Sequence, residues 1–371
     1  MKSYPLKQLT LDEAIQVQFR LVDIIQSVFS GDELLSLGDL GIVPGLGRPK
    51  TTAKVEEVLA RFFGTESAVL VRGAGSGALR LAIWAMLRPG AKLLIHQAPI
   101  YSTTKTLIES MGINVLPVDM NDLADVRRGC ALRPDAVLIQ RSRQVLTDRY
   151  DVCEVIEAIR SILPDVPIVT DENYAVMKVH LVGAAMGADA SAFSMFKLLG
   201  PEGIGCVVGR SSVIQRVRGY NYSGGSQVQG HEAMEALRSL VYVPVAQAIQ
   251  ARVVDEIAAR LNEGEVPGVI SACVANAQSR VVLVEFEEPI AANVLQAARD
   301  LGAVPYPVGA ESRYEIGAMF YRVSGSFLQA SPEMKDRVIR INPMRAGPDT
   351  VIRILRKALE RARSTQGQGM N

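Results

Sequence analysis

Cysteine and histidine are scarce in this 371-residue chain. The 4 cysteines form no CxxC pair, and none of the 3 histidines has the spacing of metal ligands. A disulfide framework requires many cysteines in a short chain, and structural zinc requires closely spaced Cys or His ligands. Both kinds of scaffold are therefore disfavoured.

The sequence also lacks an excess of charge of either sign. Lys and Arg number 40 against 39 for Asp and Glu, so no net field would draw the chain to nucleic acid or to an anionic membrane. No segment reaches the roughly 18 uninterrupted apolar residues of a membrane span, and the first residues form no apolar signal region. We therefore expect a cytoplasmic protein with a small-molecule partner.

What is present is the composition of a globular protein, with 48% hydrophobic and 21% charged residues. The length predicts about two domains. The expected organisation is an N-terminal helix and arm at 1–50, a large domain at 51–235, a linking helix at 236–264 and a small C-terminal domain at 265–371.

The large domain shows apolar strands that alternate with helices. Expected strands lie at 67–71, 91–96, 113–118, 135–140, 166–171, 188–195 and 205–209, and expected helices at 11–29, 51–64, 76–87, 102–112 and 151–163. Continuous apolar strands separated by helices predict an α/β fold with a mostly parallel sheet covered on both faces. The ligand site of such a sheet lies at the carboxyl ends of its strands.

The C-terminal third has a different pattern of apolar and polar residues. A long helix at 231–262, interrupted by Pro244, precedes strands at 279–289 and 337–343 and helices at 292–302 and 349–364. The polar alternation predicts an antiparallel sheet with helices on one side. A frayed tail at 365–371 should follow.

The first chemical candidate is the glycine-rich segment "VRGAGSGALR", residues 71–80. Backbone N–H groups at Gly73, Gly75 and Gly77, at the start of a helix, can cradle an anion. The segment also fits a dinucleotide-binding fingerprint. That interpretation expects an acid after the next strand, where the sequence has His96 and Gln97 instead.

Three side chains follow later strands, namely Tyr101, Asp171 and Lys197. Singly, each has an ordinary explanation as a packed tyrosine, a capping aspartate or a surface lysine. Together with the glycine segment they match the needs of pyridoxal 5′-phosphate (PLP). That cofactor requires a lysine for the Schiff base, a carboxylate for the ring nitrogen, a stacked aromatic ring and a phosphate cradle. Ser194 could add a hydroxyl to the cradle.

At this point the chain resembles the fold-type I PLP enzymes, the aspartate aminotransferase superfamily, over nearly its whole length. The motifs that carry this resemblance are "SGALR" (76–80), Tyr101, "TDENY" (170–174) and "SMFK" (194–197). A narrower resemblance, to the bacterial methionine γ-lyase-like group near the cystathionine synthases and class V aminotransferases, lies in "VLIQRSRQ" (137–144), "DENYAV" (171–176) and "GADASAFSMFKLLGPEGIG" (187–205). The usual "NP" pattern of aminotransferases is replaced by "QRSRQVLTD", which weakens any transfer of substrate specificity.

The resemblance implies a role for each matching position. It implies the α/β PLP-transferase fold with a small α+β domain, and a homodimer with active sites at the interface. Lys197 would carry the Schiff base, Asp171 would pair with the ring nitrogen and Tyr101 would stack on the ring. The other implied cofactor contacts are Gly75, Ser76, Gly77, Asn173, Ser194 and Arg141, the implied substrate contacts are Arg340 and Arg143, and the implied contacts to the neighbouring subunit's cofactor are Tyr222, Ser226 and Gln227.

The expected function is chemistry at the α-carbon of a small amino acid, with Lys197 as acid and base. Transamination is placed first and β- or γ-elimination second. Two other classes stay open, namely a nucleotide-binding oxidoreductase, from the glycine segment, and a non-catalytic sensor of PLP or an amino acid. Which of Arg141 and Arg143 faces the site also stays open, since alternation along a strand would put both on one face.

Overall fold

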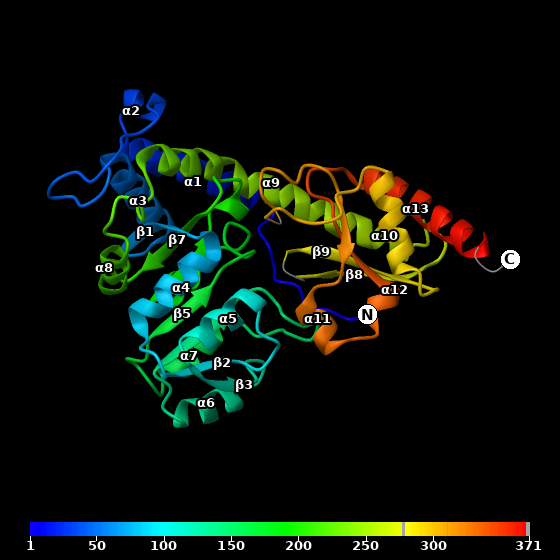
Figure 1. Ribbon diagram of the computed structural model, residues 1–371, viewed down its shortest axis with the longest axis horizontal. Coiled ribbons are helices and arrows are strands. Elements are labelled where there is room, and N and C mark those ends of the chain that lie inside the picture. The colour runs from blue at the N-terminus through cyan, green and yellow to red at the C-terminus, as the bar shows by residue number, and fades with distance from the viewer. Residues whose placement is uncertain (277–278, 310, 369–371) are drawn as a thin grey trace. The chain divides into compact units, whose positions relative to one another are not determined.

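The computed structural model describes residues 1–276, 279–309 and 311–368. The chain divides into two compact units. The large unit comprises Leu9–Arg141 and Tyr150–Val245, and the small unit comprises Met1–Gln8, Ser142–Arg149 and Ala246–Asn371 (Figure 1). The domain limits expected from the sequence stay a prediction.

A seven-stranded sheet forms the centre of the large unit. Its strands are β1 (Ser67–Arg72), β2 (Lys92–His96), β3 (Asn114–Val118), β4 (Ala136–Gln140), β5 (Ile168–Asp171), β6 (Ala190–Ser194) and β7 (Ile204–Gly209). Their order is β1-β7-β6-β5-β4-β2-β3. Strand β7 pairs antiparallel with both of its neighbours, and the other pairings are parallel. The predicted mostly parallel α/β sheet is confirmed.

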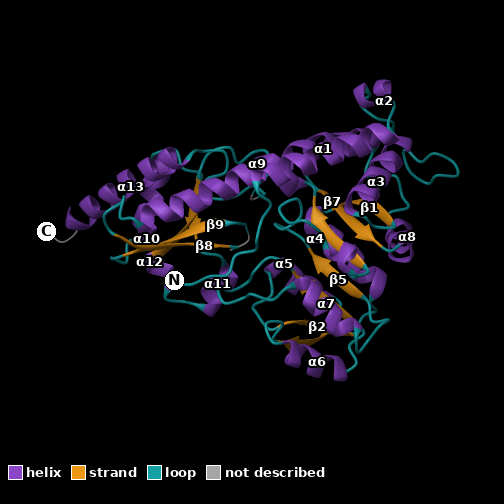
Figure 2. Cartoon of the chain, turned by 180° about the vertical axis from the view of Figure 1, so that it is seen from behind, coloured by secondary structure: helices purple, strands orange, loops and turns teal. Residues whose placement is uncertain are grey.

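Helices cover both faces of this sheet (Figure 2). The large unit contains α1 (Leu11–Val28), α2 (Gly31–Leu35), α3 (Lys50–Phe63), α4 (Ala74–Met86), α5 (Ser102–Ser110), α6 (Leu123–Ala131), α7 (Val152–Arg160), α8 (Ser211–Tyr220) and the first part of α9 (Gly230–Asn262). Helices α4, α5 and α8 share one apolar cluster with the strands. Helices α1, α3 and α9 form a second cluster, and α6 and α7 a third. Strands that are buried on both faces explain the uninterrupted apolar runs in the sequence.

Local capping signals set the helix ends where the sequence predicts them. Thr10 caps α1 through a capping box with Glu13. Gly64 ends α3 in a left-handed conformation, with φ of 65°, which glycine adopts without steric cost. Both ends therefore follow from local sequence alone.

The small unit contains a four-stranded antiparallel sheet. Its strands are β8 (Val269–Ala275), β9 (Val281–Phe286), β10 (Met319–Arg322) and β11 (Val338–Asn342), in the order β10-β11-β9-β8. Helices α9, α10 (Ala291–Asp300) and α13 (Pro348–Gln368) pack on one face. The expectation of helices on one side only is wrong, because Phe327 of α11 (Gly325–Ala330) and Met334 of α12 (Met334–Arg337) cover the other face.

Two further details differ from the sequence prediction. Helix α9 continues through Pro244 as one helix, so the expected interruption is wrong. The expected frayed tail is helical as far as Gln368, and residues 369–371 lie outside the described residues. Within the described part of the chain, no helix is long and apolar enough to cross a membrane.

Candidate functional site

The carboxyl ends of the parallel strands bring the predicted residues to one edge of the large sheet. Strand β5 ends at Asp171 and its parallel neighbour β6 ends at Ser194, three residues before Lys197. Strand β1 runs in the same direction, because it is antiparallel to β7, and leads directly into α4. The three segments with the strongest sequence signals therefore meet at the edge where α/β sheets bind their ligands.

Lys197 lies in a single turn of 3₁₀ helix, Phe196–Leu198, directly after β6. The preceding strand and Met195 are buried, whereas Lys197 is only partly buried. Its Nζ lies 3.7 Å from the centroid of the Tyr174 ring, and its backbone N–H donates to Ser194 Oγ at 3.4 Å. The lysine thus leaves the buried sheet and presents its amine over an aromatic ring, which favours a cation.

Asp171 is the last residue of β5 and is almost wholly buried. Burial raises the pKa of its carboxyl, while hydrogen bonds from Asn173 and the charge of Lys197 act in the opposite direction. Oδ1 accepts from the Asn173 backbone N–H at 3.0 Å and from Asn173 Nδ2 at 2.7 Å. Burial of a charged carboxylate costs free energy, and a cation placed beside the carboxylate offsets this cost.

The first turn of α4 forms the predicted anion cradle. Gly73 caps this helix with φ of 94°, and Ala74 follows with φ of 52°. The first N–H groups of a helix have no partner within the helix, so they can bind an anion. A Cβ at Gly75 would lie 2.1 Å from Asn173 Oδ1, and one at Gly77 would lie 2.1 Å from the Arg72 carbonyl oxygen. Only glycine fits at these two positions.

We expect Gly75→Ala to weaken cofactor binding and to destabilise the chain, because the new methyl group displaces Asn173 from the Asp171 carboxylate. The matched control is Gly219→Ala, a glycine inside helix α8 whose added Cβ would meet open space. Alanine stabilises an ordinary helical position by about 0.5–1 kcal/mol relative to glycine. Urea denaturation and cofactor titration should separate the two variants, and equal stabilisation of both would contradict the packing argument.

The two predicted arginines lie beyond the end of their strand. Strand β4 ends at Gln140, so the argument that strand alternation puts both side chains on one face is wrong. Arg141 Nη1 donates to the Leu181 carbonyl at 2.7 Å and lies 3.6 Å from Glu172 Oε1. Arg143 belongs to the small unit, where its Nε donates to the Tyr4 carbonyl at 3.4 Å. Their roles toward cofactor and substrate stay predictions.

Tyr101 and Ser76 lie at neighbouring helix starts. Tyr101 precedes α5, five residues after β2, and is partly buried. Ser76, in the first turn of α4, has its Oγ 3.2 Å from Thr103 Oγ1 of α5. This hydrogen bond joins the glycine segment to the segment that carries the tyrosine.

Arg340 lies in β11 of the small unit and is buried. Its Nε donates to the Arg322 carbonyl at 2.7 Å, and its guanidinium carbon lies 4.1 Å from the centroid of the Tyr321 ring. The guanidinium group is therefore held by the Tyr321 ring and by a backbone acceptor. Its predicted contact with substrate stays a prediction.

The three residues expected to reach a neighbouring subunit lie between α8 and α9. Tyr222 is 69% exposed. Ser226 Oγ lies 2.9 Å from Ser223 Oγ, so it is engaged within its own turn. Gln227 is buried, and its Nε2 donates to the carbonyl oxygens of Gly47 and Tyr222.

Sequence reasoning assigned no role to Tyr174 or Glu172, although both stand in the quoted "DENY" motif. Tyr174 has φ of 68°, an uncommon conformation for a bulky side chain, and its ring lies under the Lys197 amine. Glu172 is fully buried, and its Oε1 accepts from Thr170 Oγ1 at 3.0 Å and from the Gly183 N–H at 2.7 Å. Glu172 therefore fixes the loop that carries both Asp171 and Tyr174.

Comparison with protein families identifies two matching segments. Residues 49–240, which contain the whole cradle and the lysine, match the family described as aminotransferase class V. The chain belongs to this family. Residues 255–355 match the family of YhfS-like C-terminal domains.

Relatives place the chain more closely within this family. It is 52% identical to the protein YhfS of Escherichia coli (strain K12) over 360 residues, which cover 97% of this chain and 99% of YhfS. The crystal structure of YhfS, described as a PLP-dependent protein, superposes with a TM-score of 0.95. L-Methionine γ-lyase of Pseudomonas deceptionensis is 25% identical over 199 residues, 51% of this chain and 49% of that enzyme. Cystathionine γ-lyase of Micromonospora echinospora is 16% identical, with a TM-score of 0.72 over 93% of this chain and 99% of that one, and shows the fold alone.

The predicted family, the fold-type I PLP enzymes, is thus confirmed, and the cofactor prediction is confirmed for that family. The residues of this chain fit the group. The first turn of α4 supplies backbone N–H groups for a phosphate. Asp171 supplies a carboxylate for a ring N–H, and Lys197 supplies the amine.

Proposed function

We propose that this chain is a PLP-dependent enzyme that acts at the α-carbon of a small amino acid, with the cofactor bound covalently to Lys197. The observation that carries the proposal is the placement of Lys197, the buried Asp171 and the α4 cradle at one edge of the sheet. Asp171 would pair with the ring nitrogen, and Gly75, Ser76 and Gly77 would hold the phosphate.

When bound, PLP supplies an aldehyde that captures amines and a ring that accepts the electron pair left on the α-carbon. Lys197, as a free amine, would take the α-proton of the substrate at its Nζ and would later give a proton back to the product. The Tyr174 ring stabilises the ammonium form of that amine. Asp171, oriented by Asn173, supplies the negative charge that keeps a ring nitrogen protonated.

We infer that elimination of a β- or γ-substituent follows proton removal. The support is the curated relative with L-methionine γ-lyase activity, together with the "DENYAV" and "SMFK" motifs. In γ-elimination the amino acid and one water give a 2-oxo acid, ammonia and the departing group as its protonated form. The second candidate is transamination, which the sequence prediction placed first and which the class V family match supports.

The fate of the amino group distinguishes the two reactions. The holoenzyme is incubated with each of the twenty amino acids, in both enantiomers, with and without pyruvate. Elimination releases ammonia in equal amount to the 2-oxo acid and needs no pyruvate, whereas transamination forms alanine and no ammonia. Neither product with any substrate would contradict an enzymatic role and leave a sensor of PLP or an amino acid.

We also propose that Arg340 binds the substrate α-carboxylate. Arg340→Lys is expected to raise KM about 10- to 100-fold, because a bidentate, charge-assisted pair is lost and lysine cannot keep the stack on Tyr321. The control is Arg322→Lys, an exposed arginine on the adjacent strand β10. Steady-state kinetics measures both variants, and an unchanged KM for Arg340→Lys would remove Arg340 from the site.

A homodimer with active sites at the interface is a further part of the proposal. Leu35, Leu37 and Leu40 are 70–85% exposed in the arm between α1 and α3. Three exposed apolar side chains within six residues of one segment favour an interaction surface there. Light scattering coupled to gel filtration tests the dimer by measuring the mass of the particle in solution.

The predicted cytoplasmic location is a separate proposal, and fractionation of cells tests it.

A further inference from the structure

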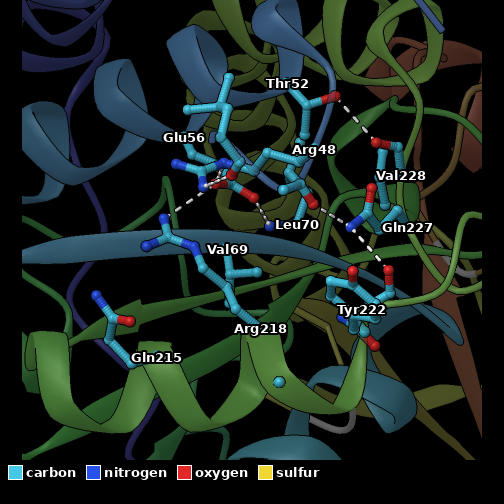
Figure 3. Close-up of a pocket in the computed structure, with 14 residues that line it drawn as sticks. Arg48, Thr52, Glu56, Val69, Leu70, Gln215, Arg218, Tyr222, Gln227 and Val228 are labelled. Carbon is cyan, nitrogen blue, oxygen red and sulfur yellow. Dashed lines mark hydrogen bonds and ion pairs between the residues drawn. The ribbon is translucent and has the colours of Figure 1, made fainter. Parts of the chain in front are cut away.

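The large unit contains a second cavity besides the one that Figure 3 shows. The cavity of Figure 3 lies between α3 and α8 and is lined by Tyr222 and Gln227, so it belongs to the region expected to reach the neighbouring subunit's cofactor. The second cavity, which we call the α1 cavity, lies between α1, the C-terminal end of α3 and residues 177–185, and its volume is about 280 Å³. None of its described lining residues lines the cavity of Figure 3, and Asp171, Lys197 and α4 are not among them.

The α1 cavity is also distant from the arm that carries the proposed dimer surface. That arm joins the C-terminal end of α1, at Val28, to the N-terminal end of α3, at Lys50. The cavity is lined instead by Val17 of α1 and by Phe62 near the other end of α3. At about 1.5 Å per helical residue, these two positions lie roughly 16–18 Å along their helices from the arm. The α1 cavity is therefore separate from the exposed leucines of the arm.

Apolar side chains form most of the lining of the α1 cavity. They include Phe62, Phe63, Met177, Val179, Val182 and Ala185. At about 30 Å³ for each water-sized group, a volume of about 280 Å³ holds about nine such groups. A six-carbon aliphatic acid has eight non-hydrogen atoms, so a molecule of that size fits.

Hydrogen bonds fix the segment 177–185, which closes one side of the cavity. Arg141 Nη1 donates to the Leu181 carbonyl at 2.7 Å. The Gly183 N–H donates to Oε1 of the buried Glu172, also at 2.7 Å. The cavity is therefore preformed, as is usual for small-molecule sites.

Arg20 supplies a positive charge at the edge of this apolar cavity. It is an exposed lining residue, and its guanidinium carbon lies 4.6 Å from the centroid of the Phe62 ring. Among the described residues, no carboxylate or other acceptor pairs with its N–H groups. The other basic residue of the lining, His180, has its Nε2 3.5 Å from Glu13 Oε1. None of the described lining residues is acidic, so Arg20 is available to an anionic group of a ligand.

We propose that the α1 cavity binds an aliphatic monocarboxylate of about six carbons. The carboxylate accepts hydrogen bonds from the Arg20 guanidinium, and the chain lies among Phe63, Met177 and Val182. Each methylene that the cavity removes from water strengthens binding. This site is separate from the proposed amino-acid site and does not depend on the chemistry proposed there.

Three probes test the proposal by calorimetric titration of the holoenzyme. Hexanoate carries the carboxylate and the full chain, butyrate has two fewer methylenes, and hexanamide lacks the charge. None contains a basic amine that could react at Lys197. Hexanoate should bind about 10- to 15-fold more tightly than butyrate, since each buried methylene contributes about 4-fold. It should bind about 3- to 10-fold more tightly than hexanamide. Equal binding of hexanoate and either other probe, or no binding of hexanoate, would overturn the proposal.

Variants locate the site. Arg20→Gln should lower the affinity for hexanoate to that for hexanamide. Val17→Phe, which fills part of the cavity, should weaken both ligands by a similar factor. Arg20 is exposed, so Arg20→Gln gives an independent result if Val17→Phe does not fold.

Two controls distinguish this site from the surface and from the proposed amino-acid site. Arg127→Gln changes an exposed arginine of α6 outside the cavity lining and should bind hexanoate as the wild type does. Arg340→Lys should also bind hexanoate normally, whatever its activity. Loss of hexanoate binding in Arg340→Lys, or an unchanged affinity in Arg20→Gln, would contradict a site in the α1 cavity.

Discussion

Lys197→Ala is expected to lose covalent cofactor and to reduce turnover on the order of 10⁴-fold, because one amine serves as attachment point and as acid and base. The variant should stay folded. Lys197 is only partly buried in a short 3₁₀ turn, so its removal leaves the apolar cluster around Phe193 and Met195 intact. Visible absorbance, far-ultraviolet circular dichroism and product formation measure the three effects.

The matched control for this variant is Lys197→Arg. Arginine keeps the positive charge over the Tyr174 ring but cannot form the covalent bond or lose a proton at neutral pH. If the charge alone mattered, Lys197→Arg would keep most of the activity. The proposed role predicts instead that the two variants are equally inactive, and full turnover in either one would disprove it.

Asp171→Asn is expected to lower turnover by about 10²- to 10³-fold, the usual effect of removing one fixed electrostatic group from an active site. The same change should stabilise the cofactor-free chain at neutral pH. Burial raises the pKa of the Asp171 carboxyl, so the folded chain holds this charge less readily than the unfolded chain does. An amide of the same shape avoids that cost, and the gain should be of the order of 1 kcal/mol.

The sign of the pH dependence follows from the same shift. A carboxyl whose pKa is raised on folding destabilises the folded chain fully above the raised value, and this destabilisation disappears as the pH falls through the ordinary value of about 3.9. The advantage of Asp171→Asn should therefore shrink as the pH is lowered from 7. Urea denaturation of the cofactor-free chains at several pH values measures it.

Asp189→Asn is the matched control for this stability effect. Asp189 is equally buried at 7%, but it lies 2.7 Å from Arg160 and 2.9 Å from Arg210. Breaking this paired group should destabilise the chain while leaving the chemistry of the folded fraction unchanged. If both Asp variants destabilised the cofactor-free chain alike, Asp171 would have a purely structural role.

Much of the fold could be predicted because each signal was local. The apolar runs that became β1, β2, β4 and β5 are buried on both faces, so their sequence pattern required no knowledge of the partners. Helices α6 and α8 were not predicted. Their sequences, "LADVRRGCA" and "SSVIQRVRGY", are short and carry two arginines each, and packing on the sheet stabilises them.

For the site as well, the sequence predicts residues that local signals mark, but not contacts that depend on the tertiary fold. Lys197, Asp171 and the glycine cradle could be predicted because they directly follow strands whose carboxyl ends share one edge. The contact between Tyr174 and the Lys197 amine could not, since it depends on a left-handed backbone conformation that the sequence does not signal at a tyrosine. Likewise, only the folded chain shows that Pro244 lies inside a continuous helix.

The covalent attachment of PLP to Lys197 is the central claim, and one measurement tests it directly. The holoenzyme is reduced with borohydride, digested and mapped by mass spectrometry. The proposed site predicts that the visible absorption band disappears and that the reduced cofactor is found on the peptide containing Lys197. Cofactor found on another lysine, or no cofactor bound to the purified chain, would contradict the proposed function.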